Sequence, residues 1–364
     1  ATLAVLARGV TLALLLGLVS IALGPVIIGL AASSLSASPA AEQLMADYIA
    51  IRLFAVPAAL ANMVLLGGLY GSQQMRLGMA LLLLVNGLNL ALDVLFVIGL
   101  GLAAEGVALA SVIAQWGGFF FMIWRVGHIW PGRLRGVLSR GTHGWAPDWF
   151  DKAAFLQFFQ LGRDIFIRTL LLLGCEALML DAAARLDDVA LALVQIMLSL
   201  FGIIAFSIDG FAHAAEALVG EAIGRRDPAM LNKVIARTNL LAGLMAVLLS
   251  LTIWVGEAPI MTLMTAQDPL IAAMRPHWVW VALLPLSSFL AFQMDGIFVG
   301  ATCGRQMRNA MLVAASLFAV VLTLQTFGLG GMMAAFAAYL AVRGLSLYLL
   351  LGQVRAKAMP AGND

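Results

Sequence analysis

The feature that most constrains this chain is its series of long apolar stretches. Residues 11–32 and 79–102 each run for more than 20 positions almost without charge. A helix rises 1.5 Å per residue, so about 20 apolar residues cross the roughly 30 Å hydrocarbon core of a bilayer. Of the 364 residues, 63% are hydrophobic and only 11% are charged, whereas soluble domains are roughly one quarter charged. The strict alternation of membrane β-strands is absent. We therefore predict an all-α integral membrane protein.

Ten membrane-spanning helices are predicted from these stretches. Lys and Arg gather in every second connection, as at Arg133 and Arg225, whereas the alternate connections carry mainly acidic residues such as Glu105 and Glu257. Because Lys and Arg accumulate on the cytoplasmic side of membranes, both ends of this chain are expected there. The expected spans are residues 5–32, 50–71, 78–99, 103–125, 160–182, 190–222, 235–256, 276–302, 308–328 and 331–352.

An internal repeat relates the two halves of the chain. Pro57 recurs as Pro285, and residues 99–101 (Gly-Leu-Gly) recur as 328–330, at offsets of 228 and 229. A constant offset across several spans indicates a parallel structural repeat. We therefore expect an amino-terminal lobe at 1–126 with four helices, a cytoplasmic interlobe linker at 127–157, and a carboxy-terminal lobe at 158–364 with six helices. The linker is basic, and its aromatic residues suit a segment that lies along the headgroup layer; the alternative is a solvated linker. The aromatic residues are Trp130, Trp145, Trp149 and Phe150.

The repeat leaves two helices without partners. The spans within residues 160–222 precede the repeated part of the second half, and the same offset would place their counterparts before residue 1. We therefore predict a six-plus-six architecture whose first two transmembrane helices, about 70 residues, are lacking here. The alternative is a natural ten-span variant.

Polar side chains on the third span predict a cation site. Asn86, Asn89 and Asp93 are spaced so that they share one helical face, and Ser111 on the next span could add a hydroxyl. Carboxylate and amide oxygens can coordinate sodium, or the amides can tune the carboxylate for protonation. The alternative is a polar network that joins helices.

Acidic residues within the later spans form the second group of candidates. An ionisable side chain in a span is costly unless it faces the bundle interior or water. Glu176, Asp209, Glu216 and Asp295 are such residues, with Arg343 as a basic exception. We expect them to line a substrate or proton cavity with a negative interior that favours cationic compounds, although acids nearer the cytoplasmic ends could instead be structural.

No sequence motif indicates an enzyme. The chain carries no nucleotide-binding Walker loop and no His or Cys cluster with metal-ligand spacing. We expect no cofactor beyond a coupling proton or sodium ion, no metal site except sodium at Asn89 and Asp93, and no nucleic-acid partner. The expected partners are small-molecule substrates and the lipid bilayer, with the protein acting as a monomer.

The motifs resemble those of one transporter family. Residues 86–93, 99–101 and 106–111 are similar to the fifth and sixth helices of the multidrug and toxic compound extrusion (MATE) family. Five further stretches resemble the DinF-like branch of this family: residues 162–168, 209–216, 295–301, 307–309 and 341–347.

This resemblance implies a secondary active antiporter in a bacterial inner membrane, with two six-helix lobes that exchange protons or sodium for drugs. It also implies that Asn89, Asp93 and Ser111 belong to the cation site of the amino-terminal lobe. The acid on the family's first helix has no counterpart here, which predicts an incomplete site. The alternatives are a flippase for lipid-linked saccharides, which an arginine-rich cavity would favour, and a non-transporting membrane scaffold.

Overall fold

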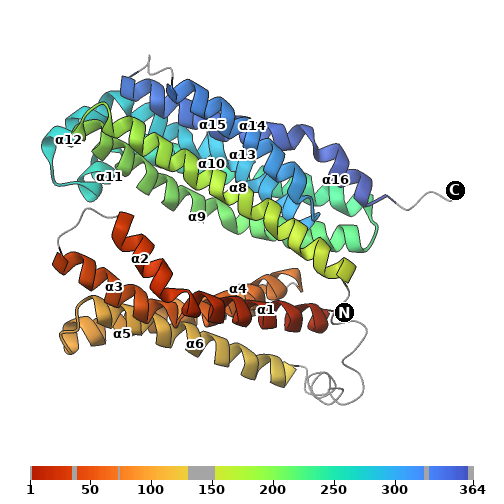
Figure 1. Cartoon of the computed structure of the whole chain (residues 1–364). Helices are drawn as coiled ribbons and strands as arrows, with labels where there is room; N and C mark the ends of the chain where they lie inside the picture. The colour runs from red at the N-terminus through yellow and green to blue at the C-terminus, as the bar shows by residue number, and fades with distance from the viewer. Residues whose placement is uncertain (1, 35–38, 73, 130–151, 324–327, 360–364) are drawn as a thin grey trace, which may run out of the picture. The chain divides into compact units, whose positions relative to one another are not determined.

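The protein is divided into two compact helical units, Ala1–Asp151 and Lys152–Asp364. The computed structural model describes residues 2–34, 39–72, 74–129, 152–323 and 328–359 (Figure 1). Every regular element within these ranges is a helix, which confirms the all-α prediction. Most of the expected linker, with its four aromatic residues, lies outside the described ranges.

In the amino-terminal unit, two helix pairs make the closest packing. The first helix packs along α4, and α5 packs along α6, which also contacts α3 and α4. Small residues such as Ala58 and Ala61 pack with Leu65, Leu81 and Met122 in the core of this unit. The elements are α1 (Thr2–Ala22), α2 (Gly24–Ser34), α3 (Pro39–Leu53), α4 (Val56–Gly71), α5 (Met75–Asp93), the π-helical turn η1 (Val94–Gly99) and α6 (Ala104–Ile129).

In the carboxy-terminal unit, one helix is central. Helix α13 packs against α9, α10 and α15, while α14 packs against α8 and α15 (Figure 1). Side chains such as Met197, Trp278 and Phe336 form the larger of its two core clusters. The elements are α8 (Lys152–Ala184), α9 (Asp188–Gly224), α10 (Pro228–Val255), α11 (Glu257–Met264), α12 (Asp268–Met274), η3 (Arg275–His277), α13 (Trp278–Gly300), α14 (Gly304–Thr323), α15 (Gly328–Leu349) and α16 (Leu351–Lys357).

Within the described residues, seven helices are long and apolar enough to cross a membrane, or nine if each of two bent helix pairs is one span. Helix α8, with 33 residues, is long enough as well, but its apolar part carries Arg168, Glu176 and Asp181. Those charges set α8 apart from the other long helices. The count of ten spans remains a prediction.

Two prolines account for the bent pairs. Helices α1 and α2 meet at 60°, and α3 and α4 meet at 50°. Proline lacks a backbone N–H, so Pro25 and Pro57 cannot continue the hydrogen-bond ladder of the preceding helix. The predicted spans 5–32 and 50–71 each contain one of these bends. Pro285, the repeat partner of Pro57, instead lies inside the continuous helix α13.

Two glycines allow α13 to approach α9 at the level of the backbone. A Cβ atom added to Gly296 would lie 2.1 Å from the carbonyl oxygen of Ala212, and one added to Gly300 would lie 2.3 Å from that of Glu216. The four-residue spacing places both glycines on one face of the helix. Such small residues let helix backbones pack closely in membranes.

We expect Gly296→Ala to destabilise the protein, because its new methyl group would push α13 away from α9. Overpacking of this kind costs about 1–3 kcal/mol, so the melting temperature in detergent should fall by several degrees. The matched control is Gly210→Ala on α9, where an added Cβ meets nothing within 4 Å. Equal melting temperatures for the two variants would contradict this prediction.

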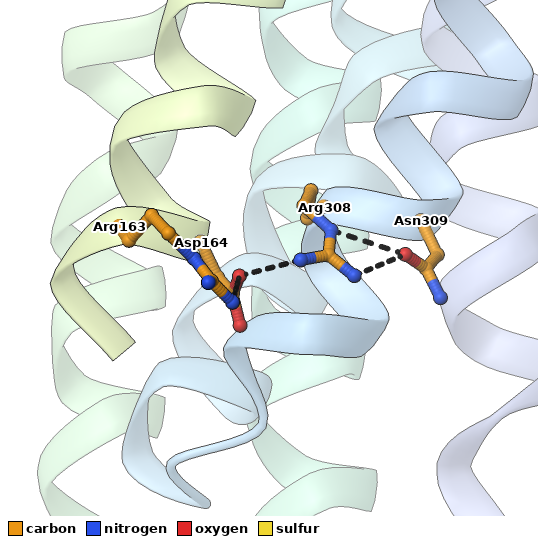
Figure 2. A network of polar contacts seen from close by, with 4 residues as sticks. All are labelled: Arg163, Asp164, Arg308 and Asn309. Carbon is orange, nitrogen blue, oxygen red and sulfur yellow. Dashed lines mark hydrogen bonds and ion pairs between the residues drawn. The ribbon is translucent and has the colours of Figure 1, made fainter. Parts of the chain in front are cut away.

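An ion pair joins the first part of α8 to α14. Arg308 Nη1 donates to Asp164 Oδ1 at 2.7 Å, and Arg163 Nη2 donates to the same oxygen at 3.2 Å. Arg308 also donates to Asn309 Oδ1 (Figure 2). The Asp164 side chain is only 2% exposed. This contact fixes α8 one turn before Arg168.

Candidate functional site

In the amino-terminal unit, the predicted cation-site residues come partly together. Asn89 Nδ2 of α5 donates to Ser111 Oγ of α6 at 3.2 Å. One carboxylate oxygen of Asp93, Oδ1, is buried and has no hydrogen-bond partner among the described residues. Asn86 is exposed, whereas Asn89 and Asp93 are half-buried. A polar contact therefore lies one helical turn from a carboxylate that retains a free acceptor.

The local backbone sets Asp93 apart from the rest of its helix. Asp93 is the last residue of α5, and the π-helical turn η1 follows at once. After η1 the chain turns sharply, and Gly101 has a φ of +69°, which favours glycine. Short π-helical segments occur often at functional sites because they shift the register of the helix. The sequence predicted one span over 78–99 but gave no sign of this change.

In the carboxy-terminal unit, Asp295 of α13 is bound by two arginines. Arg168 of α8 and Arg343 of α15 both donate through Nη2 to Asp295 Oδ2. We call these three residues the arginine–aspartate cluster. Its side chains are mostly buried, with exposed fractions of 17% for Arg168, 11% for Asp295 and 2% for Arg343.

The cluster corrects the expected role of Asp295. Asp295 was predicted as an acid with almost no basic partner, but two guanidinium groups share one of its oxygens. The reason is tertiary packing: α8 and α15 each bring an arginine to α13 from distant parts of the chain. Asp295 is therefore a counter-ion rather than an unpaired cavity acid.

The remaining predicted acids take different positions. Asp209 of α9 is half-buried and lies within electrostatic range of all three members of the cluster. Glu216, seven residues later, instead faces His213 at 3.4 Å on its own helix. Glu176 of α8 is half-buried beside Cys175 and has no hydrogen-bond partner among the described residues. Asp209 therefore lies within electrostatic range both of the cluster and of His213, the partner of Glu216.

Comparison with known proteins decides the family. Residues 165–325 match the family model MatE. DNA damage-inducible protein F of Escherichia coli is 35% identical over 323 residues, which cover 88% of this chain and 69% of that protein. The chain belongs to the MATE family.

Two further similarities agree with this assignment. Protein DETOXIFICATION 43 of Arabidopsis thaliana is 25% identical over 82% of this chain, which spans 55% of that protein. A solved outward-facing multidrug resistance MATE family transporter superposes with a TM-score of 0.81 at 20% identity, over 98% of this chain and 78% of that one. The fold is therefore that of MATE transporters, and this multi-pass membrane protein is an efflux transporter of the family rather than an enzyme.

Sequence reasoning missed one principal residue of this MATE protein. Arg168 lies within the 162–168 stretch that carried the resemblance, yet it was not counted among the charges inside spans. The sequence does indicate this residue, because Arg168 is a charged side chain directly before the run Thr169–Gly174 inside a predicted span. What no sequence pattern indicated was its partner, since Asp295 lies 127 residues away.

Two buried amides were missed as well. In the amino-terminal unit, Asn62 Nδ2 donates to the carbonyl oxygen of Gln115 at 2.8 Å and to its Oε1 at 3.0 Å, which joins α4 to α6. In the carboxy-terminal unit, Gln293 is fully buried on α13, and neither atom of its amide has a partner among the described residues. The spans containing them read as apolar, so composition concealed both.

Proposed function

We propose that this MATE transporter is a secondary active antiporter that exchanges protons or sodium ions for small organic compounds. The observation that carries the proposal is the Asn89–Ser111 contact beside the half-buried Asp93, whose Oδ1 has no partner among the described residues. A carboxylate that retains an acceptor at low dielectric can take up a proton or coordinate a cation.

Each residue has a stated role in this proposal. Asp93 carries the coupling ion, Asn89 and Ser111 supply polar oxygens beside it, and Asn86 lies on the more exposed part of the same helix. Oxygen ligands of this kind suit sodium, while a lone carboxylate suits a proton. In the carboxy-terminal unit, Asp209 and Glu176 are the half-buried acids that remain available to a substrate or proton. The proposed setting is the bacterial inner membrane, with both ends of the chain cytoplasmic and the protein acting as a monomer.

The test is transport by the full chain reconstituted in lipid vesicles. Ethidium, a cationic dye, is followed by its fluorescence while either a pH gradient without sodium or a sodium gradient without a pH difference is imposed. We expect one of the two gradients to drive dye movement against its concentration difference. Dye movement that is the same with and without either gradient would reject secondary active antiport.

A further inference from the structure

The arginine–aspartate cluster contains more positive than negative charge. Two guanidinium groups bind a single carboxylate, and both bind the same oxygen, Oδ2. Arginine stays protonated in proteins, so these three residues carry one positive charge in excess. An excess charge in a largely buried place is costly unless another group compensates it. The Asp209 carboxylate of α9 lies close enough to offset this charge in part, so the unpaired donors matter more than the charge.

The hydrogen bonds within the cluster are also incomplete. Arg343 Nη1, Arg168 Nε and Asp295 Oδ1 are buried and have no partner among the described residues. A guanidinium group offers five N–H donors in a planar fork. Both arginines therefore retain donors that the described protein groups leave unused.

The groups around the cluster explain which partner is missing. Asp209 approaches from α9 closely enough for its charge to act on the cluster, but no hydrogen bond joins it to either arginine in the described contacts. Tyr339, from the same helix as Arg343, points its hydroxyl at Met311 Sδ, 3.4 Å away. The centroid of the Phe292 ring lies 5.9 Å from the Arg343 guanidinium carbon, in a cation–π contact that supplies no lone pair for a hydrogen bond. These neighbours leave the spare donors to a further acceptor.

Arg168 is the more exposed arginine of the cluster. Its side chain is 17% exposed, whereas that of Arg343 is 2% exposed. Helix α8 is held near this point by the Asp164–Arg308 ion pair one turn earlier. An incoming ligand would therefore meet a positioned arginine first and the fully buried one behind it.

We propose that Arg168 and Arg343 form a binding subsite for an oxyanion group, such as a carboxylate or sulfonate, of the transported compound. The subsite rests on the proposed transport function and adds compounds that carry an acidic group to its substrates. Paired guanidinium forks bind such groups through two parallel, charge-assisted hydrogen bonds. The bound anion would accept hydrogen bonds from the spare donors and share the arginines with Asp295.

The test measures binding of fluorescein, an anionic dye at pH 8, to the full chain purified in detergent, by fluorescence anisotropy. We expect Arg168→Gln to weaken fluorescein binding about tenfold or more, the usual scale for loss of one charge-assisted contact. Arg168→Lys should weaken it less, because it keeps the charge but loses the fork. The matched control is Arg185→Gln on the same helix, where the pair with Asp181 is exposed.

Two results would overturn the subsite: no fluorescein binding by the unmodified chain, or equal binding by Arg168→Gln and Arg185→Gln. If Arg168→Gln does not fold, Arg168→Lys takes its place, and unchanged binding by that folded variant rejects the proposal. Ethidium transport separates this failure from failure of antiport. Gradient-driven ethidium movement with fluorescein binding insensitive to Arg168 rejects the subsite alone. Binding that depends on Arg168 without any gradient-driven transport supports the subsite and rejects antiport.

Discussion

Asp93→Asn is expected to reduce gradient-driven ethidium transport to the rate of protein-free vesicles. The substitution keeps the shape of the side chain and its capacity for hydrogen bonds, but it removes the charge that a proton or sodium ion would neutralise. Asp93 is half-buried at the end of α5, so its charge is only partly solvated. The melting temperature should change little, so loss of transport would not reflect loss of folding.

The control for this variant is Glu105→Gln, which removes an exposed acid from the first turn of α6 in the same unit. We expect the control to transport ethidium at the unmodified rate. Transport by Asp93→Asn that still follows the imposed gradient would remove Asp93 from the coupling mechanism, and the Asn89–Ser111 contact would then be a structural link between two helices.

Asp295→Ala is expected to be the most destabilising of the single substitutions considered. It would leave the Arg168 and Arg343 guanidinium groups without their shared carboxylate, and Arg343 is fully buried. Removal of one partner from a buried ion pair costs about 3–5 kcal/mol, because the remaining charge stays desolvated and unpaired. The measurement is thermal unfolding in detergent, in which this variant should melt well below the unmodified protein.

Two comparison variants sharpen this result. Arg343→Met removes the buried arginine but leaves Asp295 paired with Arg168, so it should destabilise less than Asp295→Ala. Asp181→Ala breaks the exposed pair with Arg185 and should leave the melting temperature almost unchanged, because exposed ion pairs contribute little. If Asp295→Ala were as stable as Asp181→Ala, the cluster could not be an important contact between α8, α13 and α15.

The sequence predicted that Asn89 and Ser111 lie close together, because the two residues are near each other along the chain. The two residues lie on consecutive spans joined by a short connection, so antiparallel packing of neighbouring helices brings them close. The 3.2 Å contact agrees with that geometry. Which of the three polar residues on α5 remains exposed was not predictable, because spacing places Asn86 on the same face without fixing its depth.

By itself, the sequence determined that the protein is helical and lies in a membrane, because apolar length is a local property and the cost of burying a backbone in lipid leaves helices as the solution. The sequence also indicated the family, because each of its motifs lies within one or two neighbouring helices. Only the tertiary structure decided which residues pair with Asp295. Arg168 and Arg343 lie 127 and 48 residues from Asp295 along the chain. The periodicity of the sequence does not predict which faces of α8, α13 and α15 pack against each other. Their convergence turned a predicted acidic cavity residue into the counter-ion of two arginines.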